Sequence, residues 1–407
     1  MWELSEIKVK QRLSSARFAC RPGLKRVIVV SRTSSKADVI SYRWRDLYSV
    51  VLASFKSWPF LVPVLSLINA PHGRFAFESL LNINGNFGWF IMEIPSPIFV
   101  LLGALSKPLS TSVVKGTTGF LPPMSALFSP CTKQFFALPS ANQVLVIMFL
   151  IHYTHRAVLQ PLRSPKRSPL HISVPLSAVA FNLINGFVMG SWLGGRTPWS
   201  ALPQPAVASA ALTAVSLKAG STASELARKL VSTGAVDAFG IGAPGLVSSS
   251  VWKSPLWYLG LAGWAIGFAG NVYHDGILMD IRRPKSQQQS NKNNKADDEA
   301  NIGKGSAARR YSIPRGGLFE YISFPNYLCE WFEWFSFAFA ALYSLPIFAH
   351  LSTKDAIATA LSTPPFLFPF VLVCLMAPRA TNGHAWYKKT FGDKFPKNRK
   401  AIIPFLF

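Results

Sequence analysis

The stretch RGGLFEYISFPNYLCEWFEW, residues 315–334, sets four polar side chains among aromatic and aliphatic ones: Glu320, Asn326, Glu330 and Glu333. Asn326, Glu330 and Glu333 are four and three residues apart, so a helix would carry all three on one face. Ionisable groups are costly to bury in apolar surroundings, and those found there are usually functional or paired. The stretch therefore predicts an apolar helix with a polar stripe. Glu320 precedes that helix, where we expect it to cap the chain or face water.

The composition of the whole chain is that of a membrane protein. Of its 407 residues, 50% are hydrophobic and only 15% are charged, whereas soluble domains average about 25% charged residues. The mean hydropathy is positive, at +0.26, and long apolar runs alternate with basic loops, as in chains that cross a bilayer. We therefore expect an all-α, polytopic membrane protein in contact with membrane lipids.

The formal net charge of +24 has two interpretations. A nucleic acid partner would require basic patches on a soluble domain with a recognisable motif, and the sequence contains none. Basic residues on the cytosolic side of a membrane protein explain the charge more simply, so we expect no nucleic acid partner. The four cysteines are scattered, with no C-x-x-C and no His/Cys cluster, which predicts neither a metal site nor a disulfide framework.

Seven apolar segments approach the roughly 20 residues that a helix needs to cross a bilayer. They lie at 47–69, 88–106, 143–161, 174–194, 254–278, 328–350 and 363–378. We expect residues 46–407 to form one monomeric domain of about seven transmembrane helices, with six or eight spans as alternatives. Two stretches are interpreted as insertions. Residues 196–253 are rich in Ala, Ser and Leu, and residues 286–308 are polar and low in complexity, which predicts a disordered loop.

Basic loops orient these helices. Loop 162–173, loop 280–327 and the tail after Arg379 are rich in Lys and Arg. Seven spans would put all three on one side, which predicts a cytosolic C-terminus. Residues 1–45 are also basic, although seven spans would place them on the opposite side. Their Arg-rich, Ser-rich and acid-poor sequence resembles a mitochondrial targeting segment; alternatively, the first helix is miscounted or the chain starts elsewhere.

Polar side chains interrupt two of the earlier apolar segments. Glu93 lies within 88–106, and Tyr153 and Arg156 share a helical face within 143–161 because they are three residues apart. A tyrosine paired with a buried acid can donate a proton to a carbonyl oxygen. The alternative is structural, since such groups also pair with each other to hold helices together.

Further polar residues line the C-terminal half and one helix before it. They are Asn185, the helical stripe of Asn271, Asp275 and Arg282, the stripe of Asn326 and Glu330, and Arg379 with Tyr387. Arginines and asparagines beside acids suit the phosphates, ribose and amide of a nucleotide. The chain has neither G-x-G-x-x-G after a strand nor G-x-x-x-x-G-K-[ST], so a nucleotide would be held between helices.

These residues carry a resemblance to the steroid 5α-reductase family, the 3-oxo-5α-steroid 4-dehydrogenases. It lies in NVYHDGILMDIRRP (271–284), YSIPRGGLFEYISFPNYLCEWFEW (311–334) and RATNGHAWYKKTFGDKFPKNRKAIIPFLF (379–407), and upstream in GWFIMEIPS, FLIHYTHR and the NG at Asn185. The resemblance implies a seven-helix reductase of the endoplasmic reticulum membrane. Such an enzyme uses NADPH to reduce the Δ4 double bond of a 3-oxo steroid, with hydride going to C5.

The same resemblance implies roles for individual residues. Tyr153 would donate to the 3-oxo oxygen, with Glu93 as its hydrogen-bonding partner. Asn185 would help to shape the cofactor pocket. The residues implied to hold NADPH are Arg156, Asn271, Asp275, Arg282, Tyr311, Asn326, Glu330, Arg379 and Tyr387.

Three departures from the family pattern bear on the substrate more than on the chemistry. Met92 stands where the family has Gln, and Gly383 stands where it has a His that contacts the cofactor. The loop between Pro284 and Tyr311 holds 26 residues where the family has only a few.

Other functions stay open on the sequence alone. The nearest is a reductase of another unsaturated lipid, such as a trans-2-enoyl-CoA or a polyprenol-type substrate. A membrane methyltransferase that binds S-adenosylmethionine and a non-enzymatic lipid-binding or scaffold protein are the others. Binding of NADPH, of S-adenosylmethionine or of neither separates these classes.

Overall fold

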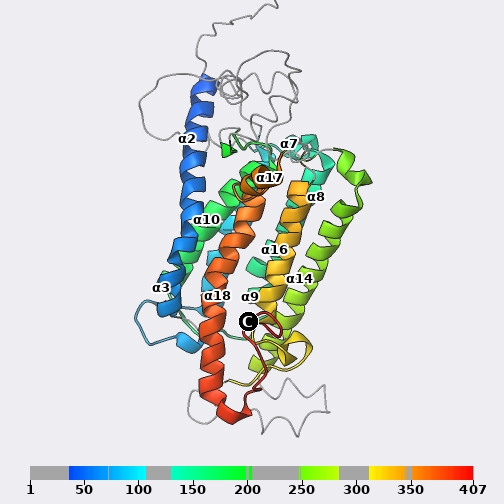
Figure 1. Ribbon diagram of the computed structural model, residues 1–407. Coiled ribbons are helices and arrows are strands. Elements are labelled where there is room, and N and C mark those ends of the chain that lie inside the picture. The colour runs from blue at the N-terminus through cyan, green and yellow to red at the C-terminus, as the bar shows by residue number, and fades with distance from the viewer. Residues whose placement is uncertain are drawn as a thin grey trace, which may run out of the picture. The chain divides into compact units, whose positions relative to one another are not determined.

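The computed structural model is built almost wholly of helices, which confirms the all-α class expected from the sequence (Figure 1). It describes residues 36–71, 73–106, 130–198, 201–203, 247, 249–283, 311–343, 345 and 351–406. Segment 1–45 and the insertions at 196–253 and 286–308 lie wholly or largely outside the described residues. The boundaries expected for them therefore stay predictions.

Twelve α-helices are found among the described residues. They are α2 (Lys36–Ser57), α3 (Val62–Leu67), α4 (Gly85–Glu93), α5 (Pro95–Leu105), α7 (Thr132–Ala137), α8 (Ser140–Thr154), α9 (Gln160–Arg163), α10 (Ser173–Leu193), α14 (Pro255–Arg282), α16 (Pro325–Tyr343), α17 (Thr353–Ala360) and α18 (Pro364–Phe391). A π-helical turn, His155–Leu159, joins α8 to α9. Two short antiparallel strands, β1 (Asn82–Ile83) and β2 (Leu170–His171), tie the loop before α4 to the loop before α10.

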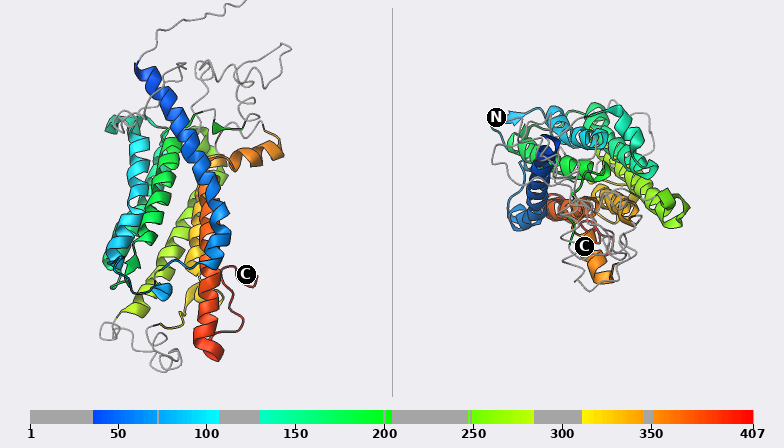
Figure 2. Two further views of the ribbon diagram at one scale, coloured as in Figure 1. Left: turned by 90° about the vertical axis from the view of Figure 1, so that its left-hand side faces the viewer. Right: turned by 90° about the horizontal axis from the view of Figure 1, so that it is seen from above.

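Over its described residues, each predicted apolar segment falls on one of these helices or on a consecutive pair with the short helical turn between them. Among the described residues, four stretches are long and apolar enough to cross a membrane: Leu47–Leu67, Gly85–Leu105, Ser173–Leu193 and Pro364–Lys394. The count of seven spans therefore stays a prediction. The short α17 runs across the direction of α16 and α18 (Figure 2).

The last helix continues well beyond the apolar segment at 363–378. α18 runs through Pro378 to Phe391. The polar residues after Pro378 do not end it, because Ala380, Gly383 and Tyr387 recur at helical spacing and are buried on one face. Helical periodicity therefore persists where hydropathy falls.

The polar stripe predicted within residues 315–334 lies on α16, and its three members Asn326, Glu330 and Glu333 are all buried. Glu320 lies outside that helix, in the 3₁₀ turn Gly317–Glu320. Its carboxylate accepts the Gly316 N–H at 2.7 Å and faces Arg315 at 3.3 Å. Partial burial opposes the effect, but these two donors lower the pKa of the Glu320 carboxyl below its usual value.

Helices α14 and α16 lie side by side (Figure 1) and pack over nearly their whole length. Small residues on α14 allow the close approach: Cβ atoms built at Gly260, Gly263 and Gly267 would meet Ala340, Ser336 and Glu333 of α16 in turn. Small residues at such spacings let helix backbones come together within membranes. Gly103 and Gly190 bring α5 and α10 together in the same way.

Two glycines of α14 give a matched test of this packing. A methyl group at Gly267 would lie 2.5–2.7 Å from the backbone and Cβ of Glu333, whereas one at Gly276 would meet nothing within 4 Å. We expect Gly267→Ala to destabilise the protein by about 1–3 kcal/mol through overpacking. Gly276→Ala should be neutral or stabilising by up to about 1 kcal/mol, because alanine favours helix. Thermal unfolding in detergent measures both variants, and equal effects would contradict the packing.

Candidate active site

A continuous chain of buried hydrogen bonds and ion pairs runs between the helices. Its members come from α4, α8, the π-helical turn, α9, α10, α14 and α16. In order along the chain they are Tyr153, Asn182, Glu93, Arg156, Glu330, Asn271, Asn326, Asp275 and Gln160. Seven of the twelve predicted site residues lie in this chain: Glu93, Tyr153, Arg156, Asn271, Asp275, Asn326 and Glu330. An eighth, Asn185, hydrogen-bonds Tyr153.

At one end of this chain, two amides hold the hydroxyl of Tyr153. The hydroxyl donates to Asn182 Oδ1 at 3.3 Å and accepts from Asn185 Nδ2 at 3.2 Å. Asn185 also donates to Ser96 at 3.2 Å. The Phe149 ring stacks on the phenol at 4.7 Å between centroids. The hydroxyl is therefore fixed by neutral donors and acceptors within an aromatic setting. Asn185, implied to shape the cofactor pocket, contacts Tyr153 itself.

Glu93 reaches Tyr153 through a third residue. Its Oε1 accepts from Arg156 Nε at 3.2 Å, and its Oε2 accepts from Asn182 Nδ2 at 3.4 Å. The direct Tyr153–Glu93 hydrogen bond that the resemblance implied is replaced, among the described contacts, by a link through Asn182. The reason is geometric: α10 places Asn182 between the last residue of α4 and the end of α8.

Arg156 lies at the centre of the chain. Besides Glu93, its guanidinium faces Glu330 at 3.6 Å and stacks over the Trp89 ring at 5.1 Å. One cation thus serves two buried carboxylates. Arg156 belongs to the π-helical turn, and such turns are rare and frequent at functional sites.

Amides and carboxylates alternate between α14 and α16. Asn271 donates to Glu330 at 3.2 Å and to the Asn326 carbonyl oxygen at 3.1 Å, and Asn326 donates to Asp275 at 3.0 Å. Asp275 also accepts from Gln160 of α9. The Asn326 Oδ1 and Gln160 Oε1 atoms are buried and have no hydrogen-bond partner among the described residues. These two oxygens are acceptors that a ligand's N–H or O–H groups could satisfy.

Four other predicted cofactor residues lie outside this chain and are here called the outer group: Arg282, Tyr311, Arg379 and Tyr387. Arg282 and Arg379 are exposed, and the Arg282 Nε donates to the Leu278 carbonyl of its own helix at 3.1 Å. Tyr311 packs against Trp386 at 5.1 Å between ring centroids, and Tyr387 is buried. Among the described residues, no hydrogen bond, ion pair or ring contact joins these four side chains to the inner chain, although Arg282 lies near enough to Asp275 for their charges to interact.

Arg74 is a member of the outer group that the sequence did not predict. Its guanidinium lies over the rings of Phe324, Trp386 and Tyr387, 5.5, 5.0 and 4.5 Å from their centroids. It also donates to the Gly383 carbonyl oxygen at 3.3 Å. A side chain at Gly383 would collide with the Phe324 ring, which gives a physical reason for the glycine found where the family pattern has a histidine.

A second buried polar pair lies near this site. His152 Nδ1 and Glu333 Oε1 form a buried pair at 2.7 Å beside the Trp334 ring. Within the described part of the chain, no group of three or more His, Cys, Asp and Glu side chains could hold a metal ion.

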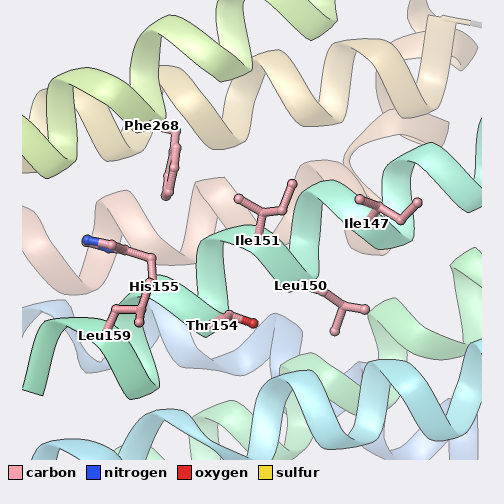
Figure 3. Close-up of a pocket in the computed structure, with 7 residues that line it drawn as sticks. All are labelled: Ile147, Leu150, Ile151, Thr154, His155, Leu159 and Phe268. Atoms are coloured by element: carbon pink, nitrogen blue, oxygen red, sulfur yellow. The ribbon is translucent and has the colours of Figure 1, made fainter. Parts of the chain in front are cut away.

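An apolar pocket of about 450 Å³ lies between α8 and α14 (Figure 3). The residues that line it are Ile147, Leu150, Ile151, Thr154, His155, Leu159 and Phe268. Neither Tyr153 nor Arg156 lines this pocket, so it is distinct from the polar chain.

Comparison with known proteins supplies relatives along most of the chain. The sequence model of a family described as 3-oxo-5-alpha-steroid 4-dehydrogenase matches residues 289–407. An uncharacterized protein of Schizosaccharomyces pombe is 32% identical over 354 residues, which cover 84% of this chain and 93% of that protein. A steroid 5-alpha-reductase of Solanum lycopersicum is 28% identical over 351 residues, covering 81% of this chain and 100% of that protein. The 3-oxo-5-alpha-steroid 4-dehydrogenase 1 of Homo sapiens is 25% identical over 342 residues, covering 83% and 87% respectively.

The position of Arg156 generates a stability prediction. Arg156→Met would leave two buried carboxylates without their cation, and breaking a buried ion pair from one side costs about 3–5 kcal/mol. Arg163→Met removes the same charge from an exposed position on α9 and should change stability by less than about 0.5 kcal/mol. Thermal unfolding in detergent compares the two. A similar midpoint for both variants would mean that the carboxylates do not depend on Arg156.

Proposed function

The chain belongs to the steroid 5-alpha-reductase family, and from that premise we propose that it reduces the Δ4 double bond of a 3-oxo steroid with NADPH. Family membership makes it an oxidoreductase that acts on CH–CH bonds. The observation that carries the finer proposal is the buried Tyr153 hydroxyl, held by two amides and joined through Asn182 to Glu93.

The residues present fit a dinucleotide of this kind. The carboxamide of a nicotinamide offers N–H donors, and the buried, unpartnered Asn326 Oδ1 is an acceptor for them. The carboxylates of Asp275 and Glu330 suit ribose hydroxyls. Arg282 and Arg379 are exposed cations in the outer group and suit phosphates. Arg156, Asn271 and Tyr387 complete the set of proposed contacts, with Tyr311 at its edge.

The main catalytic task in this reaction is the stabilisation of one oxygen atom by a hydrogen-bond donor. When bound, NADPH would supply a hydride to C5; negative charge would then develop on the 3-oxo oxygen until C4 takes a proton from water to give the saturated ketone. We assign the stabilisation of that oxygen to the Tyr153 hydroxyl. Its aromatic neighbours exclude water, so one donor aimed at the developing charge contributes more than it would in bulk solvent. The Asn185 amide supports the phenol oxygen as its electron density rises.

Glu93 acts in this scheme through its neighbours. Its carboxylate holds the guanidinium of Arg156 on one side and the amide of Asn182 on the other. It therefore links the group that donates to the substrate with the group proposed to face the cofactor. Displacement of either group would disturb the other, because both are held by the same carboxylate in a low-dielectric interior.

The setting proposed for this reaction is the endoplasmic reticulum membrane. The apolar helices support a multi-pass membrane protein. The concentration of Lys and Arg after Arg379 supports a cytosolic C-terminus, the side on which NADPH would reach the outer group. We propose that the protein acts as a monomer.

Tyr153→Phe tests the chemical assignment. Removing one donor to a developing oxyanion typically costs about 10²–10³ in rate, so kcat for a 3-oxo-Δ4 steroid should fall by that factor. The Kd for NADPH should stay unchanged, because Tyr153 is not among the proposed cofactor contacts. Turnover is measured in nanodiscs as NADPH oxidation together with formation of the 5α-dihydro product.

The outcomes of this assay separate the alternatives. NADPH binding without steroid turnover would move the substrate to another unsaturated lipid, such as an enoyl-CoA or polyprenol-type molecule. Well-folded protein that binds no NADPH would refute the reductase proposal.

Adjacent arginines test the cofactor assignment. Arg282 is proposed to face a phosphate, whereas Arg283 is paired with Asp280 at 2.6 Å. Arg282→Met should weaken NADPH binding by roughly tenfold, the size of one charge-assisted hydrogen bond. Arg283→Met, with the same loss of charge one residue away, should leave the Kd within about twofold, as expected of a surface pair. Fluorescence titration with NADPH measures both Kd values. Equal weakening in the two variants would mean that binding depends on the net charge of this region and not on a specific contact of Arg282.

A further inference from the structure

Asn182 of α10 contacts both residues of the proposed catalytic pair. It is 4% exposed. Its Oδ1 accepts the Tyr153 hydroxyl at 3.3 Å, and its Nδ2 donates to the Met92 carbonyl oxygen at 2.6 Å and to Glu93 Oε2 at 3.4 Å.

The neighbours of the amide fix its orientation. Met92 and Glu93 present only acceptor oxygens to it, a backbone carbonyl and a carboxylate. Turning the amide over would set Asn182 Oδ1 against both of these oxygens and would leave them without their donor. The amide oxygen of Asn182 must therefore face Tyr153. The oxygen and nitrogen of the amide are similar in size, and it is the hydrogen-bond network that distinguishes them here.

This orientation decides where the Tyr153 proton points. A phenol has one proton to donate. Asn185 Nδ2 is itself a donor and can only approach the phenol oxygen. The Ser96 hydroxyl also hydrogen-bonds Tyr153, but its oxygen already accepts from Asn185, so Asn182 Oδ1 is the amide acceptor offered to that proton. A substrate carbonyl oxygen that takes the proton must lie beside Asn182 Oδ1, where a small rotation of the Tyr153 O–H bond brings the proton to it.

We propose that Asn182 is a positioning residue, which aims the Tyr153 hydroxyl at the place where the substrate's carbonyl oxygen binds. The proposal rests on the function assigned to Tyr153 above. The tie through Glu93 to Arg156 keeps the amide in place while the acceptor changes. The exchange involves no covalent step, since one hydrogen bond from Tyr153 is given up and another is formed.

Three variants test this role. Asn182→Ala should lower kcat by between about 10- and 100-fold, the effect of a small misplacement of a reacting group, with NADPH affinity unchanged. Asn142→Ala is the matched control. Asn142 is also a buried asparagine, which donates to the Leu193 carbonyl at 3.0 Å and accepts from the Val247 N–H at 2.8 Å. The Asn142→Ala protein should lose stability but keep kcat.

In a Tyr153→Phe background, Asn182→Ala should change the residual rate by less than about twofold, because the two residues act as one unit.

A spectroscopic readout separates this inference from the proposed function. The Raman doublet of tyrosine reports whether its hydroxyl donates or accepts, and subtracting the Tyr153→Phe spectrum isolates Tyr153. In the Asn182→Ala protein the difference signal should change from a donating phenol to one that only accepts.

If wild-type protein reduces no 3-oxo steroid, the proposed function fails, and the Raman signal still tests Asn182. If wild-type turnover is present but kcat and the Raman signal are unaffected by Asn182→Ala, the inference is overturned. A kcat loss matched by an equal loss of NADPH affinity, or retained in the Tyr153→Phe background, would also overturn it.

Discussion

The ion pairs of one guanidinium with two buried carboxylates constrain the rest of this structure. Arg156 faces Glu93 at 3.2 Å and Glu330 at 3.6 Å within a largely apolar bundle. Removing charges from water is costly unless each is paired and also hydrogen-bonded, and one cation cannot satisfy two carboxylates. The remaining donors come from Asn182 and Asn271. The positions of four helices and the π-helical turn are therefore coupled through this one group.

Such coupling requires helix backbones to come close and polar side chains to lie between them. A single face of α14 provides both. Gly260, Gly263 and Gly267 bring this face against α16. Asn271 and Asp275 follow at the next two helical turns and donate to or accept from α16. The close approach set by the glycines places short amide and carboxylate side chains within hydrogen-bonding distance of one another. The glycines that allow close packing and the polar residues that bond to α16 thus follow one another along the same face of α14.

Periodicity in the sequence predicted each stripe but not which stripes meet. The spacing of Asn326, Glu330 and Glu333 was enough to place them on one buried face of α16. The partner of Glu93 could not be predicted, because Asn182 lies on another helix and its only signal is its position one turn before Asn185. Arg74 contacts Gly383 across 309 residues of sequence, a contact that no local pattern encodes. Hydropathy likewise predicted the end of the last apolar segment but not the end of α18.

Most polar atoms of the inner chain are already paired with one another, Asn326 Oδ1 and Gln160 Oε1 excepted, and this limits which ligands it favours. A ligand that enters must replace an existing hydrogen bond with one of the same polarity, since a buried group left unpaired costs more than a bond gains. At Tyr153 the bond to replace ends on an amide oxygen, and a ketone oxygen is equivalent in charge and geometry. A hydrocarbon or a donor-only group at that point would leave the phenol proton without an acceptor. At Asn326, by contrast, Oδ1 is buried without a partner, so that end favours a ligand that donates. Two positions of one polar chain therefore favour complementary ligand groups, a hydrogen-bond acceptor beside Tyr153 and a donor beside Asn326.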